Sequence, residues 1–411
     1  MFTSSNVMES ATRSTSPPWV FGLLVLPYGI SAGFVSVTLP FVLTNAGFSV
    51  AAAASIVAVG ISANLWRFLW GPIADLTLTL KRWYVVGVIA CAVTVVGMSV
   101  IPLRPSAPAL LTTMVFIGSV AATFVVLPIG GLMAHTVSDD RKGMASGWYQ
   151  AGNLGGMGAG GGAGVWLAHH ASLIVAGVTL GAIILVCIAA LVCVPDVSPA
   201  PGQSIGGRLR SVGRDFLDLL KSPVAIFVMV MVSSPIGSGA ATGLWSAVAP
   251  DWHASADMVA LVTGVLSGVA SAIGCVFGGW MCDRVGKWWS FFGAGTVMAI
   301  TTVVMAFAPR TPFAYETGVL AYAAWTGWSY AAYVAVLLFV VKRGAASTKY
   351  ATLGSLGNLP TTYMTAFDGW AHDKYGSRGM LNGEALLGAA SVVIGLAWLG
   401  GLNARLRDRR G

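Results

Sequence analysis

Residues 279–287 of the chain read GWMCDRVGK, and residues 71–75, which lie 208 positions earlier, read GPIAD. In each segment a glycine precedes an aspartate by four residues, at the end of a long apolar run. Two further pairs lie near the same offset, PYG at 27–29 with PIG at 235–237, and GNL at 152–154 with GNL at 357–359. Three matches near one offset indicate that the chain consists of two homologous halves.

The composition indicates that lipid surrounds both halves. Of 411 residues, 56% are hydrophobic and 9% are charged, whereas about 25% of the residues of a soluble domain are charged. The apolar runs are long enough for bilayer-crossing helices, which need about 20 residues each. We therefore predict an all-α membrane protein with twelve transmembrane helices in two pseudo-symmetric six-helix bundles. The predicted spans are 19–43, 50–71, 83–103, 108–134, 143–168, 172–194, 223–249, 258–282, 288–308, 313–341, 349–370 and 381–403.

The basic residues between these runs indicate the orientation. Of the 23 Lys and Arg residues, 18 lie in segments on the side of the N-terminus, four lie on the opposite side, and Arg67 lies within a span. Because Lys and Arg concentrate on the cytoplasmic side, we predict a multi-pass protein of the cytoplasmic (inner) membrane with both termini in the cytoplasm. The predicted domains are a cytoplasmic tail at 1–18, an N-terminal six-helix bundle at 19–194, a cytoplasmic linker at 195–222, a C-terminal six-helix bundle at 223–403 and a basic cytoplasmic tail at 404–411.

The segment at 279–287 resembles the G-x-x-x-D-R-x-G-R/K signature of the major facilitator superfamily. In that signature, glycine lets a helix end approach its neighbour, and the charged residues form a network that holds one conformation of a transporter. The first copy departs from the signature, because Leu76 follows Asp75 and the basic pair arrives late. The gating motif that the resemblance implies comprises Gly71, Asp75, Lys81, Arg82, Gly279, Asp283, Arg284, Gly286 and Lys287.

The first half also resembles one branch of that superfamily. Residues 65–75, LWRFLWGPIAD, are similar to the K/R-F-L-W-x-P-x-x-D stretch of the AmpG-like branch, and residues 33–43 and 351–360 are similar to its spans one and eleven. The resemblance implies a secondary transporter that works by alternating access, driven by a proton gradient and without another cofactor. It favours uptake of a peptidoglycan-derived muropeptide, with a siderophore (a ferric chelator) and acetyl-CoA or another organic anion as alternative substrates.

Ionisable residues within spans are unfavourable in lipid and are therefore functional candidates. Arg67 could bind an anionic group of a substrate, extend to the membrane interface, or join the network of Asp75. Glu316 and Asp368 lie near the outer ends of spans ten and eleven. We expect proton coupling at these two acids, with Glu316 as the better candidate. The alternative is that Glu316 is an ordinary interfacial carboxylate.

Amide and aromatic side chains within the spans, among them Trp325, Trp328, Tyr330 and Tyr333 of span ten, predict a substrate cavity between the two halves, near the middle of the membrane. The alternative for the aromatic residues of span ten is packing that faces lipid. Gln150 and Asn153 share a face of span five, and Asn64 is expected one turn before Arg67 on the same face of span two. The predicted substrate-binding residues are Tyr28, Asn64, Arg67, Gln150, Asn153, Trp328 and Asn358.

Span five contains a ladder of glycines at positions 152, 156, 160 and 164, preceded by Gly143 and Gly147, and span eight has a similar set at 264, 268, 274 and 278. Glycines four residues apart lie on one helix face and permit backbone contact with another helix. We expect these ladders to pack spans five and eight together across the two halves. The packing could permit a rocking motion or provide tight contact alone.

Several other classes of protein are disfavoured. The basic residues are not clustered with aromatic ones, so we expect no nucleic-acid partner. The chain has no CxxC pair and no phosphate-binding loop, and His169 and His170 lack further ligands, so we expect no metal. No acid, base and nucleophile converge, so an enzyme is not expected. We expect a monomer whose partners are the lipid bilayer and a small-molecule substrate; a membrane sensor or scaffold without transport is the rival interpretation.

Overall fold

The computed structural model describes residues 16–64, 66–195, 197, 210, 213–214, 217–218, 221–341 and 346–408. Within these residues, all regular elements are helical. The predicted tails and the predicted linker lie largely outside the described residues, and the expected roles of those segments stay predictions.

The helices follow the chain in two series. The first half forms α1 (Val20–Gly33), η1 (Phe34–Thr38), α2 (Leu39–Asn45), α3 (Val50–Ser62), α4 (Arg67–Leu76), α5 (Leu80–Val100), α6 (Ala109–Thr136), η2 (Asp139–Arg141), α7 (Lys142–Gly158), η3 (Ala159–Ala163), α8 (Gly164–His170), α9 (Leu173–Val186) and η4 (Cys187–Cys193). The second half forms α11 (Pro223–Val232), η5 (Ala240–Gly243), α12 (Trp245–Val248), η6 (Ala249–Trp252), α13 (Ala256–Ala260), η7 (Leu261–Leu266), α14 (Ser267–Val285), α15 (Lys287–Phe307), α16 (Pro312–Val341), α17 (Ala346–Leu356) and α18 (Leu359–Asp408).

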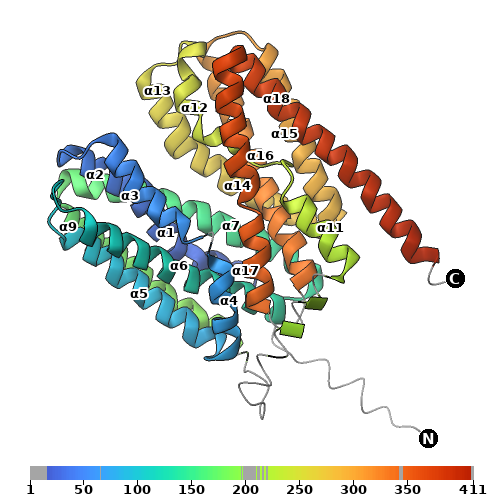
Figure 1. The fold of residues 1–411 in the computed structure, drawn as a ribbon, viewed down its shortest axis with the longest axis horizontal. Coiled ribbons are helices and arrows are strands. Elements are labelled where there is room, and N and C mark those ends of the chain that lie inside the picture. Colours follow the sequence, from blue (N-terminus) through green and yellow to red (C-terminus); the bar gives the residue numbers. More distant parts are fainter. Residues whose placement is uncertain are drawn as a thin grey trace, which may run out of the picture.

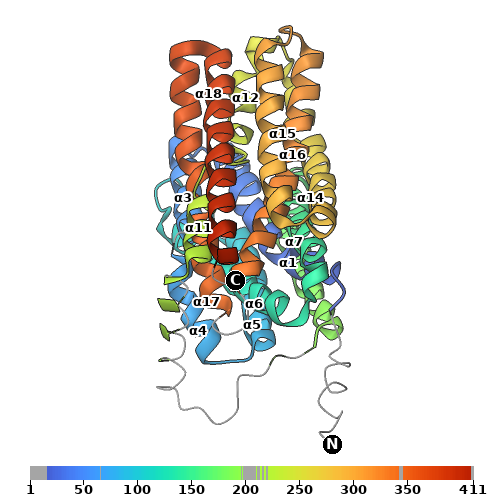
Figure 2. The same cartoon turned by 90° about the vertical axis from the view of Figure 1, so that its right-hand side faces the viewer.

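Eight helical segments of the described chain are long and apolar enough to cross a membrane. Some of the predicted spans are interrupted. The span predicted at 50–71 divides into α3 and α4, and the span predicted at 223–249 leaves regular α-helix after Val232. Conversely, α18 joins the end of the span predicted at 349–370 to the whole of the span at 381–403. Gly376 (φ 67°, ψ −173°) has non-helical backbone within it, and Figure 2 shows two arms of α18 side by side.

The break in the second predicted span corrects one expectation from the sequence. Asn64 and Arg67 do not share a face of one continuous helix, because α3 ends at Ser62 and α4 begins at Arg67. A strongly apolar pattern predicts that a segment is helical, but it contains no signal for a local break. The break places Arg67 at the first turn of a new helix.

The break in the seventh predicted span has a visible cause in its glycines. Between α11 and η5, Gly237 (φ 60°) and Gly239 (φ 67°) adopt left-handed backbone, which residues with a Cβ rarely adopt. The carbonyl of Ser238 between them accepts hydrogen bonds from the hydroxyls of Thr361 (3.0 Å) and Tyr330 (3.3 Å). Side-chain hydroxyls of α16 and α18 thus replace the backbone N–H donor that a continuous helix would have supplied to this carbonyl. We call residues 233–239 the unwound segment.

The two halves lie side by side and diverge from one end of the molecule to the other (Figure 1). At one end α4 lies against α17, and α7 lies against α14, and further contacts between the halves join α16 to α7 and α17 to α6. At the opposite end, α2 and α9 of the first half are well separated from α12 and α13 of the second. We call the end with the α4–α17 contact the latch end.

The glycine ladder of the fifth predicted span packs differently from the expectation. Added Cβ atoms at Gly152, Gly156 and Gly160 would lie 2.1 Å, 2.9 Å and 2.0 Å from backbone oxygens of α1, within the same half. The contact with α14 is instead made by Gly143 and Gly147, which lie earlier on α7. Spans five and eight therefore pack together as expected, but through Gly143 and Gly147, which precede the ladder, and not through Gly152, Gly156 and Gly160. Since each residue turns the helix by about 100°, Gly147 and Gly152 point in directions about 140° apart, and α7 uses two different faces.

Candidate functional site

A cavity of about 150 Å³ lies between the two halves. Its lining from the first half consists of Tyr28, Arg67, Tyr149, Gln150 and Asn153. The second half contributes residues of α11, the unwound segment, α15, α16, α17 and the start of α18: Val232, Ser234, Ile236, Gly237, Ser238, Phe291, Ser329, Tyr330, Tyr333, Val334, Leu337, Tyr350, Gly354, Gly357, Asn358, Pro360 and Thr361. Five tyrosines and three amides line the cavity, and Arg67 is the one ionised side chain among these lining residues.

Arg67 begins α4 and is buried, with 7% of its surface exposed. Its guanidinium group reaches across to α17, where a Cβ added at Gly354 would lie 2.3 Å from Nη2. The Nε atom has no hydrogen-bond partner, and no carboxylate of a described residue lies within 4.0 Å of this side chain. The cavity therefore contains a positive charge without a protein counter-ion.

The predicted amide residues lie around this arginine. The hydroxyl of Tyr28 donates to Oδ1 of Asn64 at 3.2 Å, so Asn64 supports the wall of the cavity although it does not line it. The Nδ2 atom of Asn153 donates to Oε1 of Gln150 at 3.1 Å. On the opposite wall, Asn358 donates to the carbonyl of Gly354 at 3.3 Å. These amides are positioned by local contacts and keep further donors and acceptors for a ligand.

Trp328 lies apart from the other predicted substrate-binding residues. It is buried between α14 and α15, where its Nε1 donates to the hydroxyl of Ser290 at 2.8 Å and its indole contacts Gly278. Tyr330 and Tyr333, which were expected among the aromatic residues of span ten, line the cavity, as do Tyr149 and Tyr350, which were not predicted. Their spacing in the sequence shows no common pattern, because they come from three helices of two halves.

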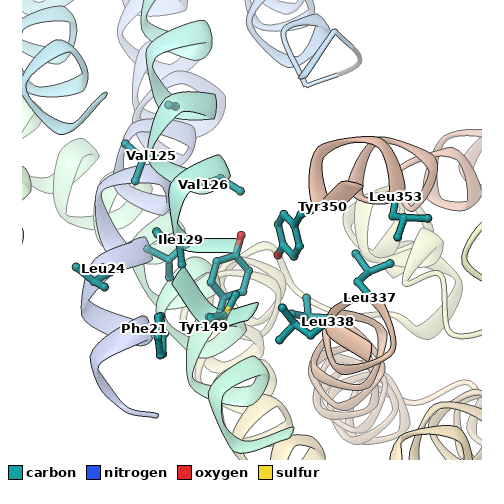
Figure 3. Close-up of a cluster of buried hydrophobic side chains, with 14 of the residues drawn as sticks. Phe21, Leu24, Val125, Val126, Ile129, Tyr149, Leu337, Leu338, Tyr350 and Leu353 are labelled. Atoms are coloured by element: carbon teal, nitrogen blue, oxygen red, sulfur yellow. The ribbon is translucent and has the colours of Figure 1, made fainter. Parts of the chain in front are cut away.

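Tyr149 and Tyr350 meet between the halves (Figure 3), with ring centroids 6.4 Å apart and an interplanar angle of 89°. Tyr149 belongs to α7, and Tyr350 belongs to α17. The ring of Tyr350 also packs on Gly130 of α6, where an added Cβ would lie 2.5 Å from it. Aliphatic residues of both halves surround this pair, among them Val126, Leu337 and Leu353 (Figure 3). The pair closes the cavity by a contact between the halves.

Asp75 forms the first of two further contacts between the halves. Its carboxylate accepts hydrogen bonds from the backbone N–H groups of Ser347 (3.2 Å) and Thr348 (2.9 Å) and from the hydroxyl of Thr348 (2.8 Å). These donors lie in the first turn of α17, where backbone N–H groups lack helical partners. Gly71 permits the approach, because a Cβ there would lie 2.7 Å from Cα of Thr348.

Asp283 repeats this arrangement in the second half. It accepts hydrogen bonds of 2.8 Å from the backbone N–H groups of both Gly143 and Met144, in the first turn of α7. A Cβ at Gly279 would lie 2.6 Å from the carbonyl of Gly143, so glycine is needed at this position as well. The two predicted motif copies thus form equivalent helix-capping contacts, and each aspartate caps a helix of the opposite half.

The basic residues of the motif do not pair with these aspartates. Among the described residues, neither Asp75 nor Asp283 has a Lys or Arg nitrogen within 4.0 Å. Two of the cations lie over aromatic rings instead: Arg284 lies over the ring of Trp280, and Lys287 over that of Phe339. Gly286 ends α14 with φ 92°, and Lys81 and Arg82 lie in the first turn of α5. The expected charge network is replaced by backbone N–H donors, which the sequence motif does not reveal.

The two acids predicted for proton coupling lie in different surroundings. Glu316 is partly exposed in the first two turns of α16. Asp368 on α18 is completely buried, and both its carboxylate oxygens lack a hydrogen-bond partner. A third acid, Glu384, is buried beside it and was not predicted. The sequence did contain a signal for a functional acid here, because Glu384 is the one acidic residue in the span predicted at 381–403.

Comparison with known protein families shows to which family the chain belongs. The family model described as Major Facilitator Superfamily matches residues 21–362. The chain belongs to the major facilitator superfamily. It is therefore a membrane transporter and not an enzyme. A search of curated protein sequences gives no match.

Solved structures of this superfamily share the fold. The chain is similar to the fucose:proton symporter FucP of E. coli, solved as a point variant, with a TM-score of 0.72, 13% identity, and coverage of 94% of this chain and 99% of that one. It is also similar to the proton:xylose symporter XylE bound to 6-bromo-6-deoxy-D-glucose, with a TM-score of 0.70, 14% identity, and coverage of 92% and 94%. At such low identity the likeness shows the fold alone.

Proposed function

We propose that this transporter moves a small polar solute with one anionic group, together with a proton, by alternating access of its two halves. The observation that carries the proposal is Arg67, a buried cation without a counter-ion in a cavity that both halves line. A buried charge without a partner is unfavourable. A carboxylate or phosphate of a bound solute would supply that partner through paired N–H donors of the guanidinium group.

The remaining lining residues favour a hydroxyl-rich or amide-bearing solute. Tyrosine rings can stack on a sugar ring and donate hydrogen bonds, and the amides of Gln150, Asn153 and Asn358 can both donate and accept. The cavity of about 150 Å³ is smaller than the roughly 300–1,000 Å³ of pockets for drug-sized ligands. These features support a sugar acid or a molecule of similar size.

The similar solved structures are named as symporters of a proton with fucose or with xylose, which supports proton coupling and a solute of this size. The AmpG-like branch, and with it a muropeptide, a siderophore or acetyl-CoA, stays a prediction from the sequence. A muropeptide shares one feature with our proposal, since its muramic acid carries a carboxylate. The larger size of a complete muropeptide argues against it in this conformation.

We also propose that residues 19–194 and 223–403 are the two moving bodies, each with six of twelve spans, and that both termini face the cytoplasm. In the conformation described here, the Asp75 and Asp283 contacts and the Tyr149–Tyr350 pair join the bodies at the latch end. A solute would enter from the opposite end. Release would require these three contacts to separate, which is the alternating-access step.

A binding experiment with matched ligands tests the anionic group. The melting temperature of the purified full-length protein is measured with D-glucuronate against D-glucose, and with N-acetylmuramic acid against N-acetylglucosamine. Binding to the folded state raises stability, so we expect a shift with the acid of at least one pair and little shift with its neutral partner. Equal shifts within both pairs, or shifts with neither pair, would contradict the proposal.

Uptake into proteoliposomes tests transport. With an inward proton gradient, we expect the acid that shifts the melting temperature to accumulate above its outside concentration, and an uncoupler to abolish the accumulation. Binding without uptake would instead support the rival interpretation of a sensor or scaffold.

A further inference from the structure

Two carboxyl groups of the second half are buried together, away from the central cavity. Asp368 is 0% exposed and Glu384 is 5% exposed. Three of their four carboxylate oxygens have no hydrogen-bond partner: both oxygens of Asp368 and Oε2 of Glu384. Within the described chain, no Lys, Arg or His nitrogen lies within 4.0 Å of either group. Two unpartnered carboxylates cannot both be ionised in such a place without a large loss of stability.

The surroundings of this acid pair are apolar. Trp245, Met298, Met305, Leu381 and Ala241 belong to the buried cluster around it, and they come from α12, α15, α18 and η5. The electrostatic partners of the two carboxyl groups are each other and Tyr322 of α16. No element that packs here brings a cation of the described chain into contact, so a proton is the simplest species that can neutralise the pair.

Tyr322 connects the acid pair to the backbone of the seventh predicted span. Its hydroxyl donates a hydrogen bond to Oε1 of Glu384 and accepts one from the N–H of Ala241 at 3.3 Å. Its ring packs edge-on against Trp245, with centroids 5.2 Å apart. The Tyr322 side chain is 0% exposed. One buried hydroxyl therefore contacts both the acid pair and the helix that follows the unwound segment.

The unwound segment connects the backbone that Tyr322 contacts, at Ala241, to the cavity. Ala241 lies two residues after Gly239, and Gly237 and Ser238 line the cavity. The hydroxyl of Thr365, three residues before Asp368 on α18, donates to the carbonyl of Ala240 at 3.2 Å. Gly237 and Gly239 interrupt the regular helix here, and the carbonyl of Gly239 accepts a hydrogen bond from the N–H of Thr242 at 3.1 Å. A shift at Ala240 and Ala241 can therefore pass along this short backbone connection to Ser238.

We propose that Asp368 and Glu384 hold one proton between them as the coupling site of the transporter, and that Tyr322 and the unwound segment transmit its presence to the cavity. The inference rests on the proposed proton-coupled transport. With the proton bound, the pair carries a single negative charge. When the proton leaves, the two negative charges repel each other. The Glu384 side chain then moves, and the Tyr322 hydroxyl moves with it.

Infrared spectroscopy of the purified full-length protein tests the proton site without any solute. A protonated buried carboxyl group has its own C=O absorption, and we expect such a band in wild type to disappear as pH rises. The band should be lost or shifted in both Glu384→Gln and Asp368→Asn, and kept in Asp257→Asn, which removes an exposed carboxylate of the same half. A band that stays unchanged in the double variant, or the absence of any titrating band in wild type, would overturn the inference.

Transport experiments test the coupling. With N-acetylmuramic acid and D-glucuronate as probes in proteoliposomes, Glu384→Gln should lose proton-driven accumulation but keep exchange of labelled for unlabelled solute, which needs no net proton movement. Tyr322→Phe should keep the titrating infrared band and lose accumulation. Accumulation by Glu384→Gln at the wild-type level would overturn the coupling role. No accumulation or exchange by wild type with either probe would count against the proposed function, whereas the infrared result would still decide the proton site.

Sodium is an alternative cation for a pair of buried carboxylates. If the melting temperature of wild type rises with NaCl but not with KCl at equal ionic strength, and Asp368→Asn abolishes the rise, the site binds Na⁺ and the proton assignment is wrong. We expect equal effects of the two salts.

Discussion

Asp75 and Thr348 are joined by two hydrogen bonds, from the backbone N–H of Thr348 at 2.9 Å and from its hydroxyl at 2.8 Å. The contact links α4 of one half to α17 of the other. Asp283 and Gly143 form the equivalent contact between α14 and α7, with a hydrogen bond of 2.8 Å. Carboxylates at helix N-termini are favoured by unpaired N–H groups and by the helix dipole. The two halves are thus held at the latch end by the same interaction, used twice.

Replacement of Asp283 by Asn should open the latch end. The amide can accept one of the two hydrogen bonds but places an NH₂ group against the other N–H donor. Since a hydrogen bond to a charged group contributes about 1.5–3 kcal/mol, the closed conformation should become roughly ten- to a hundredfold less favoured.

The native Cys282 reports this opening, because it is 6% exposed and lies against Gly143 at the latch. Its modification by N-ethylmaleimide, followed by peptide mass spectrometry, should accelerate in Asp283→Asn. The matched control Asp257→Asn, at an exposed position, should leave the rate at the wild-type level. An unchanged rate in Asp283→Asn would show that the contact does not hold the latch closed.

The close packing of α7 on α14 should not tolerate a methyl group. In Gly147→Ala the new Cβ would lie 2.6 Å from the carbonyl oxygen of Cys275 and 3.0 Å from Cα of Gly279, both of which are backbone atoms. Overpacking of this kind is destabilising by about 1–3 kcal/mol. We expect a lower melting temperature and faster modification of Cys282.

Gly268→Ala is the control for this substitution, because Gly268 lies on α14 itself and a Cβ there meets no atom within 4 Å. It should leave both measurements unchanged or slightly raise the melting temperature, since alanine is favoured over glycine in helices. Equal effects of the two substitutions would mean that helix propensity, not contact between the halves, determines the result.

Several features of the site could be predicted from the sequence because they depend on local spacing. The two motif copies located Asp75 and Asp283, and polar residues inside apolar runs located Tyr28, Gln150 and Asn153. The partners of these residues could not be predicted, because α17 and α7 approach the motif only in the folded chain. The sequence also did not reveal which face of α16 lines the cavity. That helix is apolar on all sides, so Trp328, Tyr330 and Tyr333 were all candidates for the cavity. The sequence could not indicate that Trp328 packs against α14 whereas the two tyrosines line the cavity.

Arg67→Gln should separate recognition of the anionic group from recognition of the sugar. The change keeps a polar side chain of similar length but removes the charge and its paired donors. For an acid that binds wild type, we expect roughly ten- to a hundredfold weaker affinity, from the loss of a charged hydrogen bond of about 1.5–3 kcal/mol. The affinity for the neutral partner should change little.

Gly354→Ala tests the same contact from the opposite wall. Its Cβ would lie 2.3 Å from Nη2 of Arg67 and would displace the guanidinium group without changing its charge. Weaker binding of the acid in both variants, measured by titration of the melting temperature, would place the anionic group at the guanidinium. An unaffected affinity in Arg67→Gln would assign the arginine to packing between α4 and α17.

At the end opposite the latch, Asp251 should make stability depend on acid pH. Burial alone would raise its pKa, but hydrogen bonds from Ser377 and His372 and the positive charges of His372 and Arg310 lower the pKa below the ordinary value. The unfolded chain, with a pKa of about 3.9 for Asp, then binds the proton more readily than the folded chain. The stabilisation is complete above that value and is lost as pH falls through the lower, folded-state pKa.

The melting temperature as a function of pH measures this effect. Asp251→Asn should melt below wild type at neutral pH, and the difference should shrink as the pH falls below about 4, because wild type then loses the same charge. Asp257→Asn, an exposed carboxylate a few residues later in the chain, should show little difference at any pH. A difference between Asp251→Asn and wild type that stays constant into acid would mean that the asparagine disturbs packing rather than removing a favourable charge.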